Sequence, residues 1–498
     1  MKRLFLALSL SICLISLGYA QSSSNKKVDR IRQVFTYAAP EGAPLKQDYD
    51  VFVQPRGEKE WTQIDTYMAK VNAPLPKGAK PTPTGHEISE ISYCLFDFTG
   101  DVFVRVVSKH KKFKTVRIRP DSRGVVPNVE NDSTVQFLLS QPENVSVELD
   151  GSMTDNLLVF TSKPAVSSKQ AKREAKAQKR AFLYYAPGLY TNEKIRIPSN
   201  TTVYLAGGSY FTGTFVIEDV ENVSILGRGV ARPVDGFEGC HIYRSKNVIV
   251  DGLVVNTCPI GESDDVTVHD VRSISYPGWG DGLNVFGGCS NILYDRVFCR
   301  NSDDCTTVYA TRKGFKGSVH NVRMTNSTLW ADVAHPIMIG IHGNPEVGDS
   351  IVNLRYENLD ILCQSEPQVE YQGCMTINCG DGNYVKDVVF DNIRVEQIHQ
   401  GALLQVRVGW NVKYCTAAGK GIENVLFRNV HYNGTPSYMS VICGYDEQHK
   451  VKNVTFEGLK INGRAIYDDM PDKPRWYATS DYVPLFVGSH VENLIFKK

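Results

Sequence analysis

Three aspartates stand at a spacing that could bring their carboxylates together. Asp281 lies between Gly280 and Gly282, and Asp303 and Asp304 follow 22 and 23 residues later. Carboxylates held close together repel each other, which raises the pKa of one and leaves another ionised. Acid-catalysed hydrolysis of a glycosidic bond needs that combination of a protonated acid and an ionised base. A calcium site, or acids in solvated turns, are the alternative interpretations of the same spacing.

Aromatic and basic residues near these acids could contact a sugar. Trp279 is two positions before Asp281, and an aromatic face suits the apolar face of a pyranose ring. Arg312 and Lys313, eight and nine residues after Asp304, could meet an acidic sugar or form a solvated turn. Four further aromatic residues could stack on sugars, although packing in a core or loop is the commoner use of each: Tyr276, Tyr309, Trp330 and Trp410.

A recurring pattern from about residue 186 predicts how these residues are positioned. It starts with Asn or Asp, then an aliphatic, any, and an apolar residue, as in NVSILGRG from Asn222. Ten copies follow each other as far as Asn493 at intervals of roughly 30 residues, which is a solenoid period. Because apolar and polar residues alternate within each copy, each copy predicts a strand. We therefore expect an all-β, right-handed parallel β-helix over residues 186–498, with an asparagine ladder.

The elements ahead of this solenoid predict a different fold. Residues 34–163 hold short alternating segments that are typical of a β-sandwich. The predicted strands are Tyr49–Gln54, Ile91–Phe98, Asp101–Ser108, Lys114–Arg119, Thr134–Leu139, Val145–Leu149 and Leu157–Thr161. We expect an N-terminal β-sandwich domain at 21–165, which caps the open end of the solenoid, and a basic helical linker at 166–185.

Composition and the N-terminus limit the class of protein. The chain of 498 residues has 55 basic and 54 acidic residues, a balance that argues against nucleic acid as a partner. Residues 1–20 have a basic start, an apolar run over Leu4–Leu17 and small residues before Gln21, as in a secretory signal peptide. We expect a secreted or periplasmic protein with no membrane span. Eleven cysteines follow the signal peptide, and we expect mostly buried core residues with one or two disulfides.

The chemistry-bearing motifs resemble those of family 28 glycoside hydrolases, the polygalacturonases and their relatives. Gly280–Gly282, Asp303–Cys305 and the segment from His335 to Gly340 follow each other in the order and one-coil spacing of that family. The resemblance covers about residues 186–460 and implies an inverting enzyme on a pectin-lyase-like β-helix. It implies that Asp303 is the general acid, that Asp281 and Asp304 hold and deprotonate the attacking water, and that His335 tunes the proton of the acid.

The pattern departs from that family in places that affect the substrate. Trp279-Gly280 stands where the family has Asn-Thr, and Ala334 and Pro336 stand where it has glycines. The Arg-Ile-Lys motif that binds a uronate carboxylate has no counterpart, since the segment one coil after His335 is Gly373–Ile377. We therefore expect weak hydrolysis of polygalacturonate. The sandwich ahead of the β-helix is similar in layout to family 49, the dextranase and isopullulanase group, which shares the three aspartates.

The sequence thus predicts an exported, monomeric, inverting glycoside hydrolase that acts on a polysaccharide or oligosaccharide without a cofactor or metal. A hydrolase of neutral α-glucans is the first alternative. A β-helix polysaccharide lyase is the second; it would use calcium and a Lys or Arg base and release unsaturated products. A non-catalytic glycan-binding protein, in which the acids are incidental, is the third.

Overall fold

The computed structural model describes residues 33–74, 87–191, 194–233, 238–276, 280–436 and 438–498. The predicted signal peptide and Trp279 lie outside the described residues. Residues Arg32–Lys498 form one compact unit. The predicted boundaries at 20, 165 and 185 therefore stay a prediction, although the sheets differ in kind on the two sides of residue 165.

The chain up to residue 162 folds into two facing sheets, as the alternating segments predict. A six-stranded sheet consists of β1 (Gln33–Thr36), β5 (Ile88–Thr99), β11 (Leu157–Ser162), β10 (Val145–Leu149) and β7 (Val116–Arg119), with β4 (Tyr67–Asn72) paired to β5. A five-stranded sheet consists of β3 (Thr62–Ile64), β2 (Tyr49–Pro55), β6 (Val102–Ser108), β9 (Thr134–Leu139) and β8 (Asn128–Asn131). Alternate residues of the facing strands fill a core of their own, which makes this region a β-sandwich.

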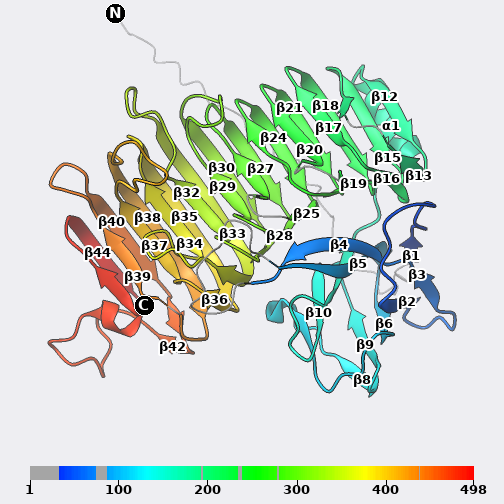
Figure 1. Ribbon diagram of the computed structural model, residues 1–498, viewed down its shortest axis with the longest axis horizontal. Coiled ribbons are helices and arrows are strands. Elements are labelled where there is room, and N and C mark those ends of the chain that lie inside the picture. Colours follow the sequence, from blue (N-terminus) through cyan, green and yellow to red (C-terminus); the bar gives the residue numbers. More distant parts are fainter. Residues whose placement is uncertain (1–32, 75–86, 192–193, 234–237, 277–279, 437) are drawn as a thin grey trace, which may run out of the picture. The chain divides into compact units, whose positions relative to one another are not determined.

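From β12 onward the strands pair in parallel, apart from the antiparallel pair β41 and β42, and form a right-handed parallel β-helix (Figure 1). One wall is an eleven-stranded sheet: β14 (Lys194–Arg196), β17 (Thr214–Glu218), β20 (Cys240–Tyr243), β23 (Ile260–Gly261), β26 (Leu283–Val285), β29 (Thr306–Val308), β32 (Ile337–Gly340), β34 (Met375–Cys379), β37 (Leu404–Val408), β39 (Ser440–Cys443) and β43 (Leu485–Val487). We call this wall the eleven-stranded sheet throughout.

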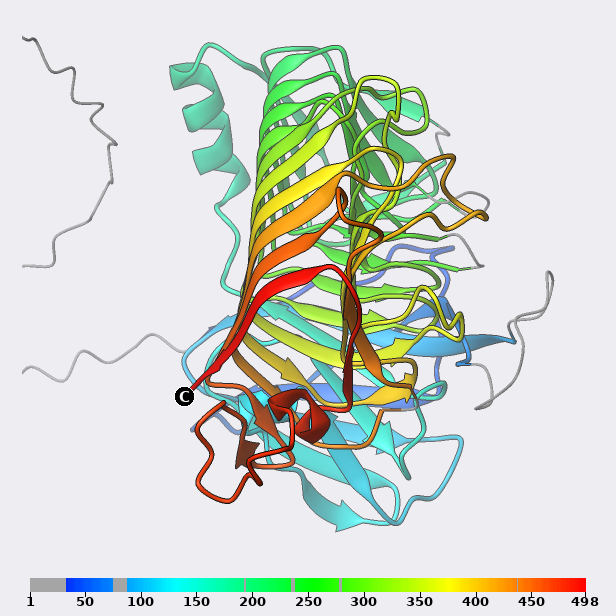
Figure 2. The same cartoon turned by 90° about the vertical axis from the view of Figure 1, so that its left-hand side faces the viewer.

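The other walls belong to one bent sheet whose strands also run coil after coil (Figure 2). Its members are β12 (Ala181–Tyr185), β13 (Gly188–Tyr190), β15 (Thr201–Leu205), β16 (Ser209–Phe211), β18 (Glu221–Gly227), β19 (Val230–Ala231), β21 (Lys246–Asp251), β22 (Val254–Val255), β24 (Asp264–His269), β25 (Arg272–Ile274), β27 (Ser290–Asp295), β28 (Phe298–Asn301), β30 (Val319–Thr325), β31 (Thr328–Ala331), β33 (Ser350–Ser365), β35 (Tyr384–Val395), β36 (Ile398–Gln400), β38 (Gly421–Tyr432), β40 (Val451–Glu457), β41 (Lys460–Ile461), β42 (Arg464–Ala465) and β44 (Val491–Lys497). Helix α1 (Ser168–Ala177) packs on β12 and β15 and buries Ala171 and Ala175.

The repeated Asn lies within a strand, at a bend where its backbone adopts the left-handed conformation. Asn321 and Asn353, for example, have φ of 59° and 60°, a region that Asn tolerates better than most residues. The Nδ2 of Asn353 donates to Oδ1 of Asn321 at 2.7 Å, and Asn321 donates to Asn291 at 3.0 Å. The predicted asparagine ladder is therefore confirmed. Inside the solenoid, stacked rings repeat the same coil spacing, as between Phe427 and Phe456 with centroids 4.8 Å apart.

The expectation that the sandwich caps the open end of the solenoid is wrong. Tyr93, Phe160 and other sandwich residues share a buried cluster with an outward-facing stripe of the solenoid: Tyr210, Val230, Val254, Ile274, Phe298, Trp330 and Leu362. These residues come from successive coils, so the sandwich packs along the side of the β-helix rather than on its end. An apolar stripe on an outer face has to be buried as much as an open end does. The first coil instead leaves Leu183 and Tyr184 exposed.

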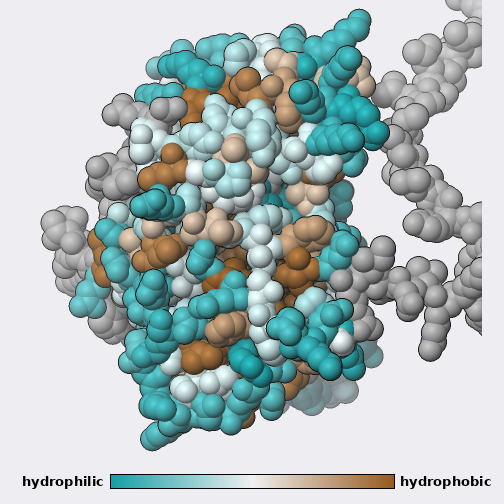
Figure 3. All heavy atoms as spheres, turned by 90° about the vertical axis from the view of Figure 1, so that its right-hand side faces the viewer, coloured by the Kyte–Doolittle hydropathy of each residue, from teal (hydrophilic) through white to brown (hydrophobic). Residues whose placement is uncertain are grey.

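Two further features complete the fold. The face that Figure 3 shows is largely hydrophilic, with scattered hydrophobic patches.

All eleven described cysteines are free, so the expected disulfides are absent from the described residues. Ten of these cysteines are buried, which confirms the prediction that most of them are core residues. A buried thiol behaves as a small apolar side chain, which explains the many cysteines in the solenoid core.

Candidate active site

Asp281, Asp304 and His335 occupy equivalent positions on three consecutive coils. Leu283 in β26 pairs with Thr306 in β29, and Thr306 pairs with Ile337 in β32. Each of the three residues lies two positions before its paired residue, so one register position carries two carboxylates and an imidazole. Asp303 immediately precedes Asp304. The structure thus brings together the four residues that the sequence singled out, as stacking of equivalent positions requires.

Hydrogen bonds anchor Asp304. Its Oδ1 accepts from the backbone N–H of His335 at 3.1 Å and lies 2.6 Å from Nδ1 of the same residue. Its Oδ2 accepts from the hydroxyl of Tyr309 at 2.9 Å. Only 3% of Asp304 is exposed. Both carboxylate oxygens are therefore held by protein donors, which fixes the position of this group.

His335 is held between two acceptors. Nδ1 faces Asp304 and Nε2 faces the backbone carbonyl of Tyr371. Because neither partner can donate, both ring nitrogens have to carry a proton, which makes the ring an imidazolium. Burial lowers the pKa of His335, but the charge of Asp304 and its hydrogen bond outweigh burial and raise that pKa above its ordinary value. His335 and Asp304 thus form a buried ion pair.

The other two aspartates have raised pKa values. Burial, followed by the charge of Asp304, raises the pKa of Asp281 to about 7, against the lowering effect of the hydrogen bond that Asn284 donates at 2.8 Å. Burial, followed by the charges of Asp281 and Asp304, raises the pKa of Asp303 well above its usual range. Asp303 has one hydrogen bond from the backbone N–H of Asp304, at 3.0 Å. Burial and mutual repulsion thus favour the protonated form of both carboxyl groups.

Close packing fixes the segment around Asp281. The carbonyl of Gly280 accepts from Ser275, and Asn301 donates to Ser275 at 2.9 Å. A Cβ at Gly280 would lie 2.4 Å from Oγ of Ser302, and one at Gly282 would lie 2.4 Å from Oδ1 of Asn301. Glycines on both sides therefore allow the chain carrying Asp281 to lie directly against the next coil.

Two residues that the sequence did not single out belong to the same cluster. Glu366, 2% exposed, lies in the segment between β33 and β34, and burial raises its pKa to about 7. Its charge raises the pKa of Asp303. Tyr371 stands edge-on to His335, with ring centroids 4.7 Å apart. Glu366 directly follows β33 and Tyr371 lies four positions before β34, and neither stands at the position equivalent to Asp304 and His335, so the repeat gives no signal for them.

Arg312 and Lys313 lie in the loop that follows β29. Lys313 and Arg312 both lower the pKa of Asp281, in that order, so their charges act on the acids. Arg312 lies over the ring of Tyr309 and Lys313 over the ring of Phe286, at 5.6 and 5.5 Å from the centroids. The predicted contact of Arg312 and Lys313 with an acidic sugar stays a prediction.

The other aromatic candidates differ in exposure. Tyr309 is buried and holds Asp304, and Trp330 is fully buried between Arg119 and Arg300, so neither presents a face to a sugar. Tyr276 is partly exposed with Lys70 over its ring. Trp410 is 48% exposed. Core packing thus accounts for the two buried residues.

The position one coil after His335 lacks a cation. Ile337 pairs with Met375 in β34, so Gly373 is the equivalent of His335, and the outward-facing residues of β34 are Thr376 and Asn378. No arginine or lysine stands on this strand. The gap inferred from the sequence therefore lies at the expected place in the fold.

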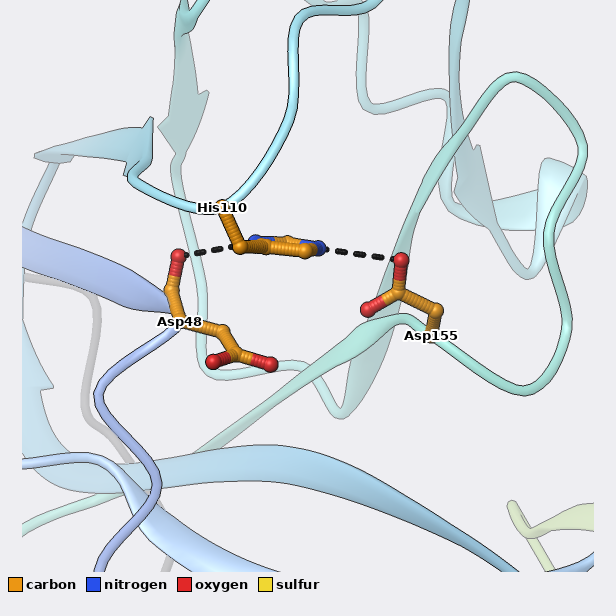
Figure 4. Close-up of side chains that lie close together, drawn as sticks. All are labelled: Asp48, His110 and Asp155. Carbon is orange, nitrogen blue, oxygen red and sulfur yellow. Dashed lines mark hydrogen bonds and ion pairs between the residues drawn. The ribbon is translucent and has the colours of Figure 1, made fainter.

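A second polar cluster, in the sandwich, offers ligand atoms of Asp48, His110 and Asp155 within 4.8 Å of one another (Figure 4). His110 bridges the backbone carbonyl of Asp48 and the carboxylate of Asp155. Lys46 pairs with Asp48, and Lys111 pairs with Asp155 at 2.6 Å. Because lysines already neutralise both acids, this cluster joins three loops as an ion-pair network and needs no metal.

The part of the chain that the structure describes contains no helix suited to crossing a membrane.

No family model matches the chain, and no curated protein matches it. Solved structures with a similar fold include Dex49A from Penicillium minioluteum, at 13% identity, covering 91% of this chain and 96% of that chain, with a TM-score of 0.49. A family 28 exopolygalacturonase from Yersinia enterocolitica has 11% identity, coverages of 79% and 96%, and a TM-score of 0.44. A GH87 α-1,3-glucanase from Streptomyces thermodiastaticus has 13% identity, coverages of 87% and 82%, and a TM-score of 0.34. At these identities the likenesses concern the fold alone.

Proposed function

We propose that the chain is an exported, monomeric, inverting glycoside hydrolase that cleaves a polysaccharide or oligosaccharide. The observation that carries the proposal is the pairing of two carboxyl groups with raised pKa values, Asp281 and Asp303, beside an anchored ion pair of Asp304 and His335. An acid that stays protonated near neutral pH and a neighbouring base that ionises there are the two groups that inversion needs.

In the proposed reaction, Asp303 donates its proton to the leaving glycosidic oxygen as the bond from that oxygen to the anomeric carbon breaks. A water molecule attacks the anomeric carbon from the opposite face and gives a proton to Asp281, whose Oδ1 has no protein partner among the described residues. Asp304, whose position is fixed by hydrogen bonds to both oxygens, orients this water. The carboxyl groups of Asp281 and Asp303 are expected to lie roughly 6.5–9.5 Å apart, which leaves room for the water.

The test is digestion of a panel of purified polysaccharides, with detection of new reducing ends and of the anomer first released by nuclear magnetic resonance. We expect one substrate class to be cleaved with inversion, and Asp303→Asn to lower kcat by about 10²–10⁴-fold. Asp295→Asn, a change of the same kind in β27 of the other sheet, is the control. Full turnover by Asp303→Asn would refute the assignment and favour a non-catalytic role for the acids.

A polysaccharide lyase is the second candidate, because Arg312 and Lys313 act electrostatically on Asp281 and could supply the base. Lyase action would give unsaturated products that absorb in the ultraviolet, and a chelator would abolish it. Products without that absorbance, formed in the presence of chelator, would exclude lyase action.

The neutral α-glucan alternative is tested by comparing the hydrolysis of dextran and pullulan with that of pectic glycans in the same panel.

A further inference from the structure

A small, half-open hollow of about 20 Å³ lies beyond the acids on the outward face of the eleven-stranded sheet. Asn378 of β34, Arg407 of β37 and Asn411 of the following loop line it, together with Glu370 and neighbouring backbone. Asn378 and Arg407 are paired in register on adjacent strands. Since β37 is three strands from β29, the hollow lies about 14 Å along the sheet from the coil of Asp304.

Most of the surface of the hollow is apolar and includes Ile341 and Cys415, but two of its residues carry hydrogen-bond donors that the protein does not use. Nδ2 of Asn378 and Nδ2 of Asn411 are buried without a partner, although Oδ1 of Asn378 accepts from Gln405 at 2.7 Å. Asn378 is only 7% exposed. Buried donors are normally satisfied, so two of them in one small space indicate a missing acceptor.

Arg407 adds a positive charge to the same space. Its guanidinium contacts the thiol of Cys443 and, at 3.5 Å, the backbone carbonyl of Glu370, but it forms no ion pair with any described residue. The carboxylate of Glu370 does not approach it within 4.0 Å. An arginine fork beside two amide donors matches the planar or tetrahedral oxygens of an anion.

We infer that this hollow is a subsite for an anionic substituent, a carboxylate or a sulfate ester, on a sugar at some distance from the bond that is cleaved. The inference rests on the proposed function, because it places the sugar chain along the face that carries the acids. The space suits a charged group of a few atoms rather than a whole ring. Trp410, between lining residues 409 and 411, leaves half of its side chain exposed for the sugar that bears this group.

The test is calorimetric binding in the Asp303→Asn background, which separates binding from turnover. Three probes are compared: a galacturonate tetramer, the same tetramer with its carboxyl groups reduced, and a sulfated galactan tetramer. We expect at least one charged tetramer to bind about tenfold or more tightly than the reduced one. Which of the two charged tetramers binds more tightly distinguishes carboxylate from sulfate.

Arg407→Gln and Asn411→Asp are each expected to remove that preference, because one deletes the cation and the other places a carboxylate beside it. Arg355→Gln, which removes an exposed arginine from β33, is the matched control and is expected to leave the preference unchanged. Melting curves confirm that each variant is folded. Equal affinity for charged and reduced tetramers, or equal losses in Arg407→Gln and Arg355→Gln, would overturn the inference. Residual hydrolysis by Asp303→Asn would count against the proposed catalytic role alone.

Discussion

Nδ1 of His335 lies 2.6 Å from Oδ1 of Asp304, one coil away, and the backbone N–H of His335 donates to the same oxygen. The two contacts tie consecutive coils together at the point where the acids meet. The side chain of His335 is fully buried, so it acts on the reaction through Asp304 rather than by touching a substrate. His335 is thus a positioning residue.

Replacing His335 by Asn is expected to lower kcat by about 10–100-fold with little change in KM, because Asp304 loses a charge-assisted hydrogen bond worth about 1.5–3 kcal/mol. Steady-state kinetics on the cleaved polysaccharide measure both constants. His320→Asn, an exposed histidine in β30, serves as the control. Unchanged kcat and an unchanged pH profile in His335→Asn would contradict this role.

The pH profile of kcat/KM is expected to be bell-shaped. Activity falls as pH drops below about 7 because Asp281 takes up a proton, and it falls at higher pH as Asp303 loses its own. Asn284→Leu removes a donor that lowers the pKa of Asp281, so the acidic limb should move up by about one pH unit. The control Asn128→Leu, an exposed site in β8, should leave both limbs in place. If the acidic limb of Asn284→Leu moves to lower pH or does not move, Asp281 is not the group that titrates.

Polygalacturonate is expected to be a poor substrate, because the strand after His335 offers Thr376 and Asn378 where a reacting uronate would need a cation. Reducing ends released from polygalacturonate and from its carboxyl-reduced form, at equal enzyme concentration, measure the difference. We expect slower release from the acidic polymer. Rapid cleavage that is lost in Arg312→Ala or Lys313→Ala would show that these two residues replace the missing cation.

The sandwich and the solenoid share a buried ion pair whose disruption should be costly. Nε of Arg228 donates to both carboxylate oxygens of Asp97 at 2.8 and 2.9 Å, and Asp97 is 1% exposed. Asp97→Ala leaves the buried guanidinium with only the more distant carboxylate of Asp270, at 3.8 Å, and should lower the free energy of unfolding by about 3 kcal/mol. Asp97→Leu combined with Arg228→Met removes both charges and should lose less. Urea titration compares the two, and equal losses would contradict the argument.

The asparagine ladder offers a test of backbone strain. Asn353→Ala should destabilise the protein by about 2 kcal/mol, because it removes the bond to Asn321 and forces alanine to φ of 60°. Asn353→Gly removes the same bond without the steric cost. Glycine should therefore have the higher melting temperature of the two in scanning calorimetry. A lower melting temperature for glycine would assign the effect to chain entropy instead.

Much of the fold was predictable because it depends on local patterns. Alternation gives the strands of the sandwich, as with Thr134–Leu139, where the predicted and observed bounds coincide. The segments β1, β3, β4 and β8 were missed. β1, β3 and β8 are too short to show alternation, and β4 carries an apolar residue, Met68, between its buried residues. The repeated Asn predicts the solenoid, because each copy needs a left-handed residue at the same bend.

The sequence by itself determined which acids meet, because a solenoid places residues one coil apart beside each other, and Asp281, Asp304 and His335 are spaced by single coils. Only the tertiary structure decided what surrounds them. Glu366, Tyr371 and Asn411 come from loops whose lengths differ from coil to coil, so no repeat predicts where they lie. The same holds for the side on which the sandwich packs. That contact depends on an outward stripe of apolar residues assembled from many coils, a pattern that exists only after the coils have stacked.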